Sequence, residues 1–404
     1  MALISALTPA IAGGPAGAAP RSAAPAGART DVASLPAVAP AAEAPKPPKP
    51  RGPSTLDASL TRTAEKLLRG AKPVEGAIVA LEPKTGRVLV FEAIGTGATS
   101  QEVLTQARLP AASLFKVVTT TALFETTPVT PQDQVCINGG MHGIERRHLE
   151  PARGPGAECG RFAWALGNSK NAVFAQLATR LLTRDDLLKT AERIGFNQKL
   201  PLDGEEQAEL GKLTVPYNDL EFARAAAGFQ GSSLSPLGAA YLMTLIARGG
   251  SPIGLKLHEA PPEASDSAPT AQASPLFSAR TAQRITRMLE VTVETGTSRG
   301  AFTAADGKRY LPGIRVAGKT GTLRPEQSED TMTSWFVGFA PSRNPEIVVS
   351  VMLVNGHTYR RKANELARDL LRTYFRAHGH AQTVTDPFAE PVATPEPLAA
   401  AQAQ

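Results

Sequence analysis

Apolar residues follow two different patterns along this chain, and the order of the patterns indicates the fold. Residues 56–71 repeat apolar side chains at the spacing of one helical turn, which predicts an amphipathic helix. Mostly apolar runs over 75–82 and 87–92 predict two strands, and the turn sequence between them at 83–86 makes them a hairpin. The chain therefore begins its folded part with one helix and one pair of strands.

The middle of the chain is mostly helical and its last part returns to strands. Helices are predicted over 113–124, within 162–182, and over 185–194, 219–229, 236–247 and 279–293. Strands are predicted over 314–318, 333–340 and 347–354, and a last helix over 362–378. This order predicts an α+β fold, an antiparallel sheet flanked by helices with an all-helical lobe inserted at about 109–250. A cleft between the two parts is the natural place for a site.

Composition changes this picture at both ends of the chain. Residues 1–55 are dominated by Ala, Pro and Gly, and residues 381–404 by Ala, Pro, Glu and Gln. Such segments hold too few large apolar side chains to build a core, so we predict that both are disordered. The 404-residue chain, 42% of it hydrophobic, then leaves 56–380 as one folded domain. A Pro-, Ala- and Ser-rich stretch at 251–275 predicts a loop inside it.

Charge and motif content exclude several classes of function. The net charge of +6 permits attraction to an anionic envelope polymer. The sequence has no dense Lys/Arg stripe with interleaved aromatics, so we do not expect nucleic-acid binding. The six histidines lack ligand spacing, so we expect no metal site and no cofactor. No apolar run is long enough to span a bilayer. The first residues are apolar but carry no Lys or Arg, which leaves an export signal and a misassigned start equally open.

Two cysteines flank a stretch with little helix or strand signal. Cys136 and Cys159 enclose a segment rich in Gly, Pro and Arg. A disulfide closing such a loop would stabilise the protein by about 3 kcal/mol in an oxidising compartment. Two separate buried thiols are the alternative. The disulfide is favoured because the loop has little else to hold it.

The first candidate for chemistry is Ser113 followed by Lys116. Ser113 stands at the start of a predicted helix, where its oxygen can accept a hydrogen bond from an unpaired backbone N–H. Lys116 lies three residues on and therefore on the same helical face, which would let its amine activate the serine as a nucleophile. Taken alone, the spacing favours an ordinary helix cap followed by a surface lysine.

Two further clusters downstream change that balance. Ser169-Lys170-Asn171 and Lys319-Thr320-Gly321-Thr322 follow Ser113 in the order of the S-x-x-K, S-x-N and K-T-G signature. On these clusters the chain resembles the transpeptidase domain of penicillin-binding proteins, from about Gly76 to His380. A second Lys-Thr-Gly at 84–86 falls in the predicted hairpin turn, and we assign it no catalytic role.

Each residue of the first two clusters has a chemical reason. Ser113 would attack a carbonyl and a neutral Lys116 amine would accept its proton, which requires a lysine pKa lowered by roughly three units. Burial and a second cation such as Lys319 would lower it. Ser169 would relay the proton to the departing amine. Asn171 can donate and accept, so it would hold a substrate amide and the Lys116 amine.

The third cluster suits an anionic, extended substrate. Lys319 supplies a positive charge, and Gly321 lacks a side chain, so a peptide can lie along this strand edge. We expect Thr320 to point into the protein body and the Thr322 hydroxyl to bind a carboxylate. The resemblance implies that the backbone N–H groups of Thr322 and Ser113 form the oxyanion hole.

The leading hypothesis is a peptidoglycan D,D-transpeptidase outside the cytoplasm, in the periplasm or cell envelope. Ser113 would form an acyl-enzyme on stem peptides ending in D-Ala-D-Ala, and β-lactams would acylate it as mimics; other envelope proteins are possible partners. Transfer to water would instead make it a D,D-carboxypeptidase. A serine β-lactamase is the second hypothesis, although one such class usually has an apolar residue where Asn171 stands. A non-enzymatic sensor or scaffold is the third, which the intact clusters disfavour.

Overall fold

The computed structural model describes residues 52–95, 97–203, 205–259, 273–324, 330–356 and 360–379. The segments predicted to be disordered lie outside these ranges, except for residues 52–55. Thr55 is buried, and its hydroxyl donates a hydrogen bond to Val88 O at 2.8 Å. The folded part of the chain therefore already includes the residues just before 56.

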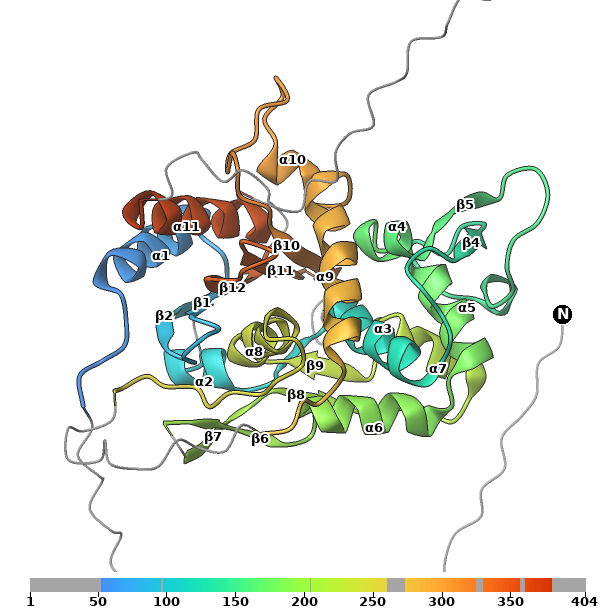
Figure 1. Cartoon of the computed structure of the whole chain (residues 1–404), viewed down its shortest axis with the longest axis horizontal. Helices are drawn as coiled ribbons and strands as arrows, with labels where there is room; N and C mark the ends of the chain where they lie inside the picture. Colours follow the sequence, from blue (N-terminus) through green and yellow to red (C-terminus); the bar gives the residue numbers. More distant parts are fainter. Residues whose placement is uncertain are drawn as a thin grey trace, which may run out of the picture. The chain divides into compact units, whose positions relative to one another are not determined.

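A five-stranded antiparallel sheet forms the centre of the domain. Its strands are β1 (Glu75–Leu81), β2 (Val88–Gly95), β10 (Ala317–Leu323), β11 (Met332–Ala340) and β12 (Ile347–Asn355). They lie in the order β10-β11-β12-β1-β2, so the first strands of the chain pair with the last (Figure 1). The register places Ile78 of β1 opposite Val351 of β12. This order leaves β10, which carries the Lys-Thr-Gly cluster, at one edge of the sheet.

Helices cover both faces of the sheet. Helices α1 (Ala58–Ala71) and α11 (Ala363–Ala377) pack on one face, and α8 (Pro236–Ala247) packs on the other (Figure 1). Side chains alternate along a strand, so neighbouring residues of β12 enter different cores. Val349 packs with α1 and α11, whereas Val348 packs with the core that contains α8. The predicted α+β fold with a helix-flanked antiparallel sheet is confirmed.

The helical lobe follows the β1–β2 hairpin along the chain, and one of its predicted helices is divided into two. Its helices are α3 (Phe115–Thr126), α4 (Phe162–Gly167), α5 (Asn171–Leu181), α6 (Arg184–Ile194) and α7 (Asp219–Ala226), and α9 (Ala279–Glu294) packs against α3 and α4. The prediction of a helix within 162–182 missed that the chain turns between α4 and α5. The turn is at Ser169, whose φ of +56° lies in the left-handed region.

Several short elements had no clear signal in the sequence. They are α2 (Ser100–Thr105), α10 (Arg299–Phe302), β3 (Leu109–Pro110), β4 (Gln134–Ile137), β5 (Glu158–Arg161), β6 (Lys199–Leu202), β7 (Glu205–Glu209), β8 (Gly211–Leu213) and β9 (Ser232–Leu234). Most are strands of two to five residues, too short to show a period. Because β3 to β9 lie within 109–250, the prediction that the lobe there is all-helical was wrong. Part of the predicted loop at 251–275 lies outside the described residues. In the described ranges we find no helix that could cross a bilayer.

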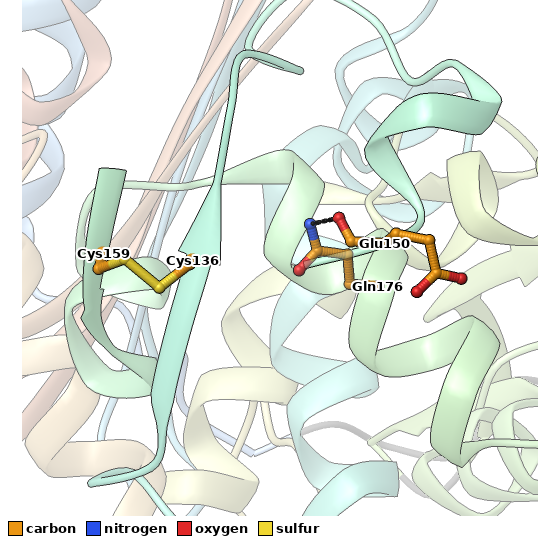
Figure 2. Close-up of a disulfide and its surroundings, with 4 residues drawn as sticks. All are labelled: Cys136, Glu150, Cys159 and Gln176. Carbon is orange, nitrogen blue, oxygen red and sulfur yellow. Dashed lines mark hydrogen bonds between the residues drawn. A yellow bond between two sulfur atoms is a disulfide. The ribbon is translucent and has the colours of Figure 1, made fainter. Parts of the chain in front are cut away.

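A disulfide joins the two strands of the β4–β5 hairpin. Cys136 and Cys159 are directly opposite each other in the register and are bonded (Figure 2). The side chain of Gln176 on α5 donates a hydrogen bond to Glu150 O at 3.0 Å, in the segment between the two strands (Figure 2). Of the two interpretations of the cysteines, the structure has the disulfide.

Candidate active site

A cleft of about 610 Å³ lies between the edge strand β10 and the helical lobe. Its lining includes Ser113 from the 3₁₀ turn η1 (Ala112–Leu114), Ser169 from the α4–α5 connection, Asn171 at the start of α5, and Thr320 and Thr322 from β10. Three clusters that are far apart in the sequence therefore meet around one hollow.

Four of the predicted residues form a continuous chain of hydrogen bonds. Lys116 Nζ donates to Ser113 Oγ at 2.8 Å, and Ser169 Oγ donates to the same oxygen at 2.7 Å. Lys319 Nζ donates to Ser169 Oγ at 3.1 Å. The two hydroxyls thus lie between the two amines, which is an arrangement that can pass a proton from one end to the other.

Ser113 does not act as a helix cap. Helix α3 begins at Phe115, and its N-cap residue Leu114 makes no side-chain hydrogen bond to the backbone. The Ser113 hydroxyl is bonded to Lys116 and Ser169 instead. Because η1 runs directly into α3, residues three apart still share one face, and this places the amine of Lys116 beside the hydroxyl.

Both lysines of the site are completely buried. Besides Ser113, Lys116 Nζ donates to Ala227 O at 2.5 Å, and Lys319 Nζ donates to Thr320 O at 2.9 Å. Burial, and then the charge of Lys319, hold the pKa of the Lys116 amine well below its usual range. Burial alone lowers the pKa of Lys319 to about 7. A neutral Lys116 amine next to a serine hydroxyl is able to accept its proton.

The expectation for Thr320 was wrong. Thr320 and Thr322 both line the cleft, and Thr320 Oγ1 lies 2.6 Å from Thr297 Oγ1 in a hydrogen bond. The reason is the alternation of side chains along β10, because Lys319 takes the buried side. At Gly321 an added Cβ would lie 3.3 Å from the Cβ of Ala112, so the strand approaches η1 closely there.

Asn171 lines the cleft but has a partner that the sequence did not indicate. Its Nδ2 donates to Met141 O at 2.6 Å, in the segment that follows β4. Among the residues that the structure describes, the Lys116 amine is bonded to Ser113 and to Ala227 O. The expected hydrogen bond between Asn171 and the Lys116 amine is therefore not formed, because the asparagine amide is directed to the segment between β4 and β5.

Two backbone features of the site were missed. Ala112, immediately before Ser113, has a φ of +49°, and Gly228 has a φ of +81°. A Cβ at Gly228 would lie 2.1 Å from Ala112 O, so only glycine fits against the turn that carries Ser113. The available signal was the glycine itself, because a glycine near the end of a predicted helix often marks its C-terminus. The helix predicted over 219–229 does end early, at Ala226.

Within the described ranges, no group of three His, Cys, Asp or Glu side chains is placed to hold a metal ion. The side chains that line the cleft include no Asp or Glu, again among the residues that the structure describes.

Comparisons with known proteins agree on one family. The family model for the penicillin binding protein transpeptidase domain matches residues 76–372. Peptidoglycan D,D-transpeptidase PbpA of Mycobacterium tuberculosis is 26% identical over 325 residues, which cover 70% of this chain and 62% of the relative. Stage V sporulation protein D of Bacillus subtilis is 25% identical over 328 residues, 74% of this chain and 49% of the relative. The chain thus spans less than two thirds of the length of these curated relatives.

Solved structures share the fold. A ceftriaxone acyl-enzyme of penicillin-binding protein A from Mycobacterium tuberculosis superimposes with a TM-score of 0.65 at 21% identity, covering 80% of this chain and 79% of that one. A structure titled as a peptidoglycan glycosyltransferase from Burkholderia ambifaria has a TM-score of 0.65 at 24% identity, covering 82% and 99%. Because both sequence identities are below 25%, the structural similarity establishes the fold alone.

Proposed function

Because this chain belongs to the penicillin-binding protein transpeptidase family, we propose that it is a serine D,D-transpeptidase acting on peptidoglycan stem peptides. The family match confirms the resemblance drawn from the three clusters. The observation that carries the proposal is the hydrogen-bonded chain from Lys116 through Ser113 and Ser169 to Lys319. A serine between a neutral amine and a second hydroxyl suits acyl transfer.

In the acylation step, Ser113 Oγ attacks the carbonyl of the penultimate D-Ala while Lys116 takes the hydroxyl proton. The new C–O bond gives a tetrahedral oxyanion, held by the backbone N–H groups of Ser113 and Thr322. The C–N bond then breaks as Ser169 gives its hydroxyl proton to the departing D-Ala amine and takes in its place the proton that Lys116 had accepted. The product is an ester of Ser113. In a β-lactam the same attack opens the ring, and the leaving amine stays attached.

Substrate binding falls to β10. As an edge strand, β10 can take an extended peptide as an added strand. The missing side chain of Gly321 instead lets β10 pack closely on η1, because an added Cβ would lie 3.3 Å from the Cβ of Ala112. The hydroxyls of Thr320 and Thr322 line the cleft and can donate to the terminal carboxylate of the donor peptide. Lys319 contributes positive charge near this end, since its amine lies beside Thr320 O.

The fate of the acyl-enzyme separates the alternatives. Transfer to an amine of a neighbouring strand gives transpeptidation, and transfer to water gives D,D-carboxypeptidase activity. A serine β-lactamase needs a base that activates water rapidly. The decay rate of the acyl-enzyme on Ser113 therefore distinguishes β-lactamase turnover from a slowly hydrolysed acyl-enzyme.

The proposed substrate implies a place in the cell. Peptidoglycan stem peptides are cross-linked outside the cytoplasm, and the disulfide between Cys136 and Cys159 suits an oxidising compartment. We therefore place the protein in the periplasm or cell envelope. A scaffold without activity would have no use for the buried amines around Ser113.

Labelling with a fluorescent penicillin tests the proposal. Wild-type protein should acquire a covalent label that decays slowly, mass spectrometry should place the adduct on Ser113, and Ser113→Ala should stay unlabelled. Incubation with a D-Ala-D-Ala peptide and an amine acceptor then distinguishes a cross-linked product from simple release of D-Ala. An unlabelled wild type, or equal labelling of Ser113→Ala, would defeat the proposal, and rapid turnover of the label would favour a β-lactamase.

A further inference from the structure

Lys170 stands between Ser169 and Asn171 and has no part in the chemistry above. Its Nζ donates to both carboxylate oxygens of Glu158, at 2.7 Å and 2.9 Å. The amine also lies 4.9 Å from the ring centroid of Trp164, close enough for a cation–π interaction. Only 12% of the Lys170 side chain is exposed. This side chain is therefore fixed, although it belongs to a connection between two helices.

The residue next to it needs support. Ser169 has a φ of +56°, a region that residues other than glycine adopt only when their surroundings hold them there. Its own N–H donates to Leu166 O at 3.1 Å, and the N–H of Lys170 donates to Ala165 O at 2.8 Å. These two bonds fix the chain on the α4 side. The side chain of Lys170 fixes it on the other side.

The partner of Lys170 belongs to a braced element. Glu158 precedes Cys159 on β5, and the disulfide ties that strand to β4. The segment that joins the two strands is in turn bonded to α5, through Asn171 to Met141 O and through Gln176 to Glu150 O (Figure 2). The cross-linked hairpin therefore contacts the α4–α5 connection through Lys170 and the following helix α5 through Asn171 and Gln176.

The contact contributes little to stability as such. Glu158 is 53% exposed, and ion pairs that are open to solvent are worth little to folding. Lys170 is also the N-cap residue of α5, where its side chain makes no capping bond. Ser, Asp or Asn would stabilise the helix better at that position. Lys170 therefore does not stabilise the start of α5 as a capping residue would, but its side chain is long enough to reach Glu158.

We propose that Lys170 and Glu158 are positioning residues, and that their ion pair holds Ser169 in the left-handed conformation from which its hydroxyl meets both Ser113 and Lys319. The inference rests on the proposed function, because it assigns a role in acylation. Neither residue is among those that line the cleft. They act by keeping the Ser169 oxygen 2.7 Å from Ser113 Oγ and 3.1 Å from Lys319 Nζ.

Acylation kinetics with a fluorescent penicillin test the inference on the full chain. The limiting acylation rate and the half-saturating concentration are measured for wild type, Lys170→Met, Glu158→Gln and Lys170→Arg. Lys189→Met is the matched control, since Lys189 forms an exposed pair with Asp185 at 3.6 Å on α6. Thermal unfolding and the final extent of labelling report how much of each protein is folded.

Lys170→Met and Glu158→Gln should each lower the limiting rate roughly 10- to 100-fold, the effect of misplacing a reacting group by about 1 Å. The half-saturating concentration, the labelled fraction and the unfolding temperature should stay near wild type. Lys170→Arg should recover most of the rate, and Lys189→Met should not differ from wild type.

Wild-type acylation rates in both Lys170→Met and Glu158→Gln would overturn the inference while leaving the proposed function intact. The same holds if both variants lose labelled fraction and unfolding temperature together at an unchanged limiting rate, which would make the pair merely structural. Failure of the wild type itself to label would instead overturn the proposed function.

Discussion

Lys116 and Lys319 are both fully buried, and each donates a hydrogen bond to a different member of one pair of hydroxyls. Two ammonium groups so close in a dry site disfavour each other's charge, so at least one amine is neutral near pH 7. The positions assign the tasks: Lys116, beside Ser113, accepts a proton, and Lys319, beside Thr320 O on the edge strand, remains the better site for positive charge.

Replacing Lys116 by Met should nearly abolish acylation. The change keeps a long side chain in the buried space but removes the proton acceptor next to Ser113, and general-base catalysis contributes about 10²- to 10⁴-fold. The rate of labelling by a fluorescent penicillin should fall by that order while circular dichroism still reports a folded protein. Labelling at the wild-type rate would show that another group takes the proton.

Much of this fold could be predicted from local pattern. Helix α8 has the predicted bounds of 236–247, because Ser235-Pro236 is a strong start and Gly249-Gly250 a strong stop. Strands β1 and β12 are mostly apolar and buried on every residue, so their signals were strong. In contrast, the β4–β5 hairpin depends on pairing between short segments 23 residues apart, which no local period reveals.

The sequence indicated which residues belong to the site but not the direction in which each side chain points. The three clusters could be found from residue types and order alone. Which way Thr320 faces depends on which side of β10 Lys319 occupies, and this is decided by the packing of the lobe against the sheet. The left-handed backbone at Ser169 likewise has no signature in the sequence, because serine rarely adopts it.

A methyl group at Gly228 should disturb the turn that carries the nucleophile. The Cβ of Gly228→Ala would meet Ala112 O at 2.1 Å, and the φ of +81° disfavours any L side chain, so the turn before Ser113 has to move. We expect a loss of about 1–3 kcal/mol in unfolding free energy and slower acylation. Denaturant titration and labelling kinetics measure the two effects.

Gly300→Ala is the matched control for that change. Gly300 lies in the short helix α10 with no atom within 4 Å of the added Cβ, so the substitution should be neutral or slightly stabilising. If Gly228→Ala behaved like Gly300→Ala, the close approach to Ala112 would have no bearing on the nucleophile.

The hydroxyl of Thr322 should contribute to affinity rather than to stability. Thr322→Val keeps the shape of an exposed cleft residue but removes a donor to the substrate carboxylate, and a hydrogen bond to a charged group is worth about 1.5–3 kcal/mol. The half-saturating penicillin concentration should rise by roughly 10- to 100-fold at an unchanged unfolding temperature. Thr63→Val on α1 serves as the control, since the Thr63 hydroxyl donates to Ser59 O within its own helix. Unaltered affinity in Thr322→Val would remove Thr322 from the binding site.

The buried charge of Lys319 should make stability depend on pH in an unusual direction. Burial lowers the pKa of this amine to about 7, whereas an unfolded lysine titrates near about 10.4. Between these values the unfolded chain binds a proton that the folded chain lacks, so the unfolding free energy rises with pH, by up to about 1.4 kcal/mol per pH unit. Lys319→Met removes this contribution to the pH dependence. Lys116 stays in both proteins, with a pKa that is lowered chiefly by its own burial. The stability of wild type relative to Lys319→Met should therefore increase from about pH 7 to about pH 10 in denaturant titrations. Parallel curves for the two proteins would mean that Lys319 stays protonated in the folded state.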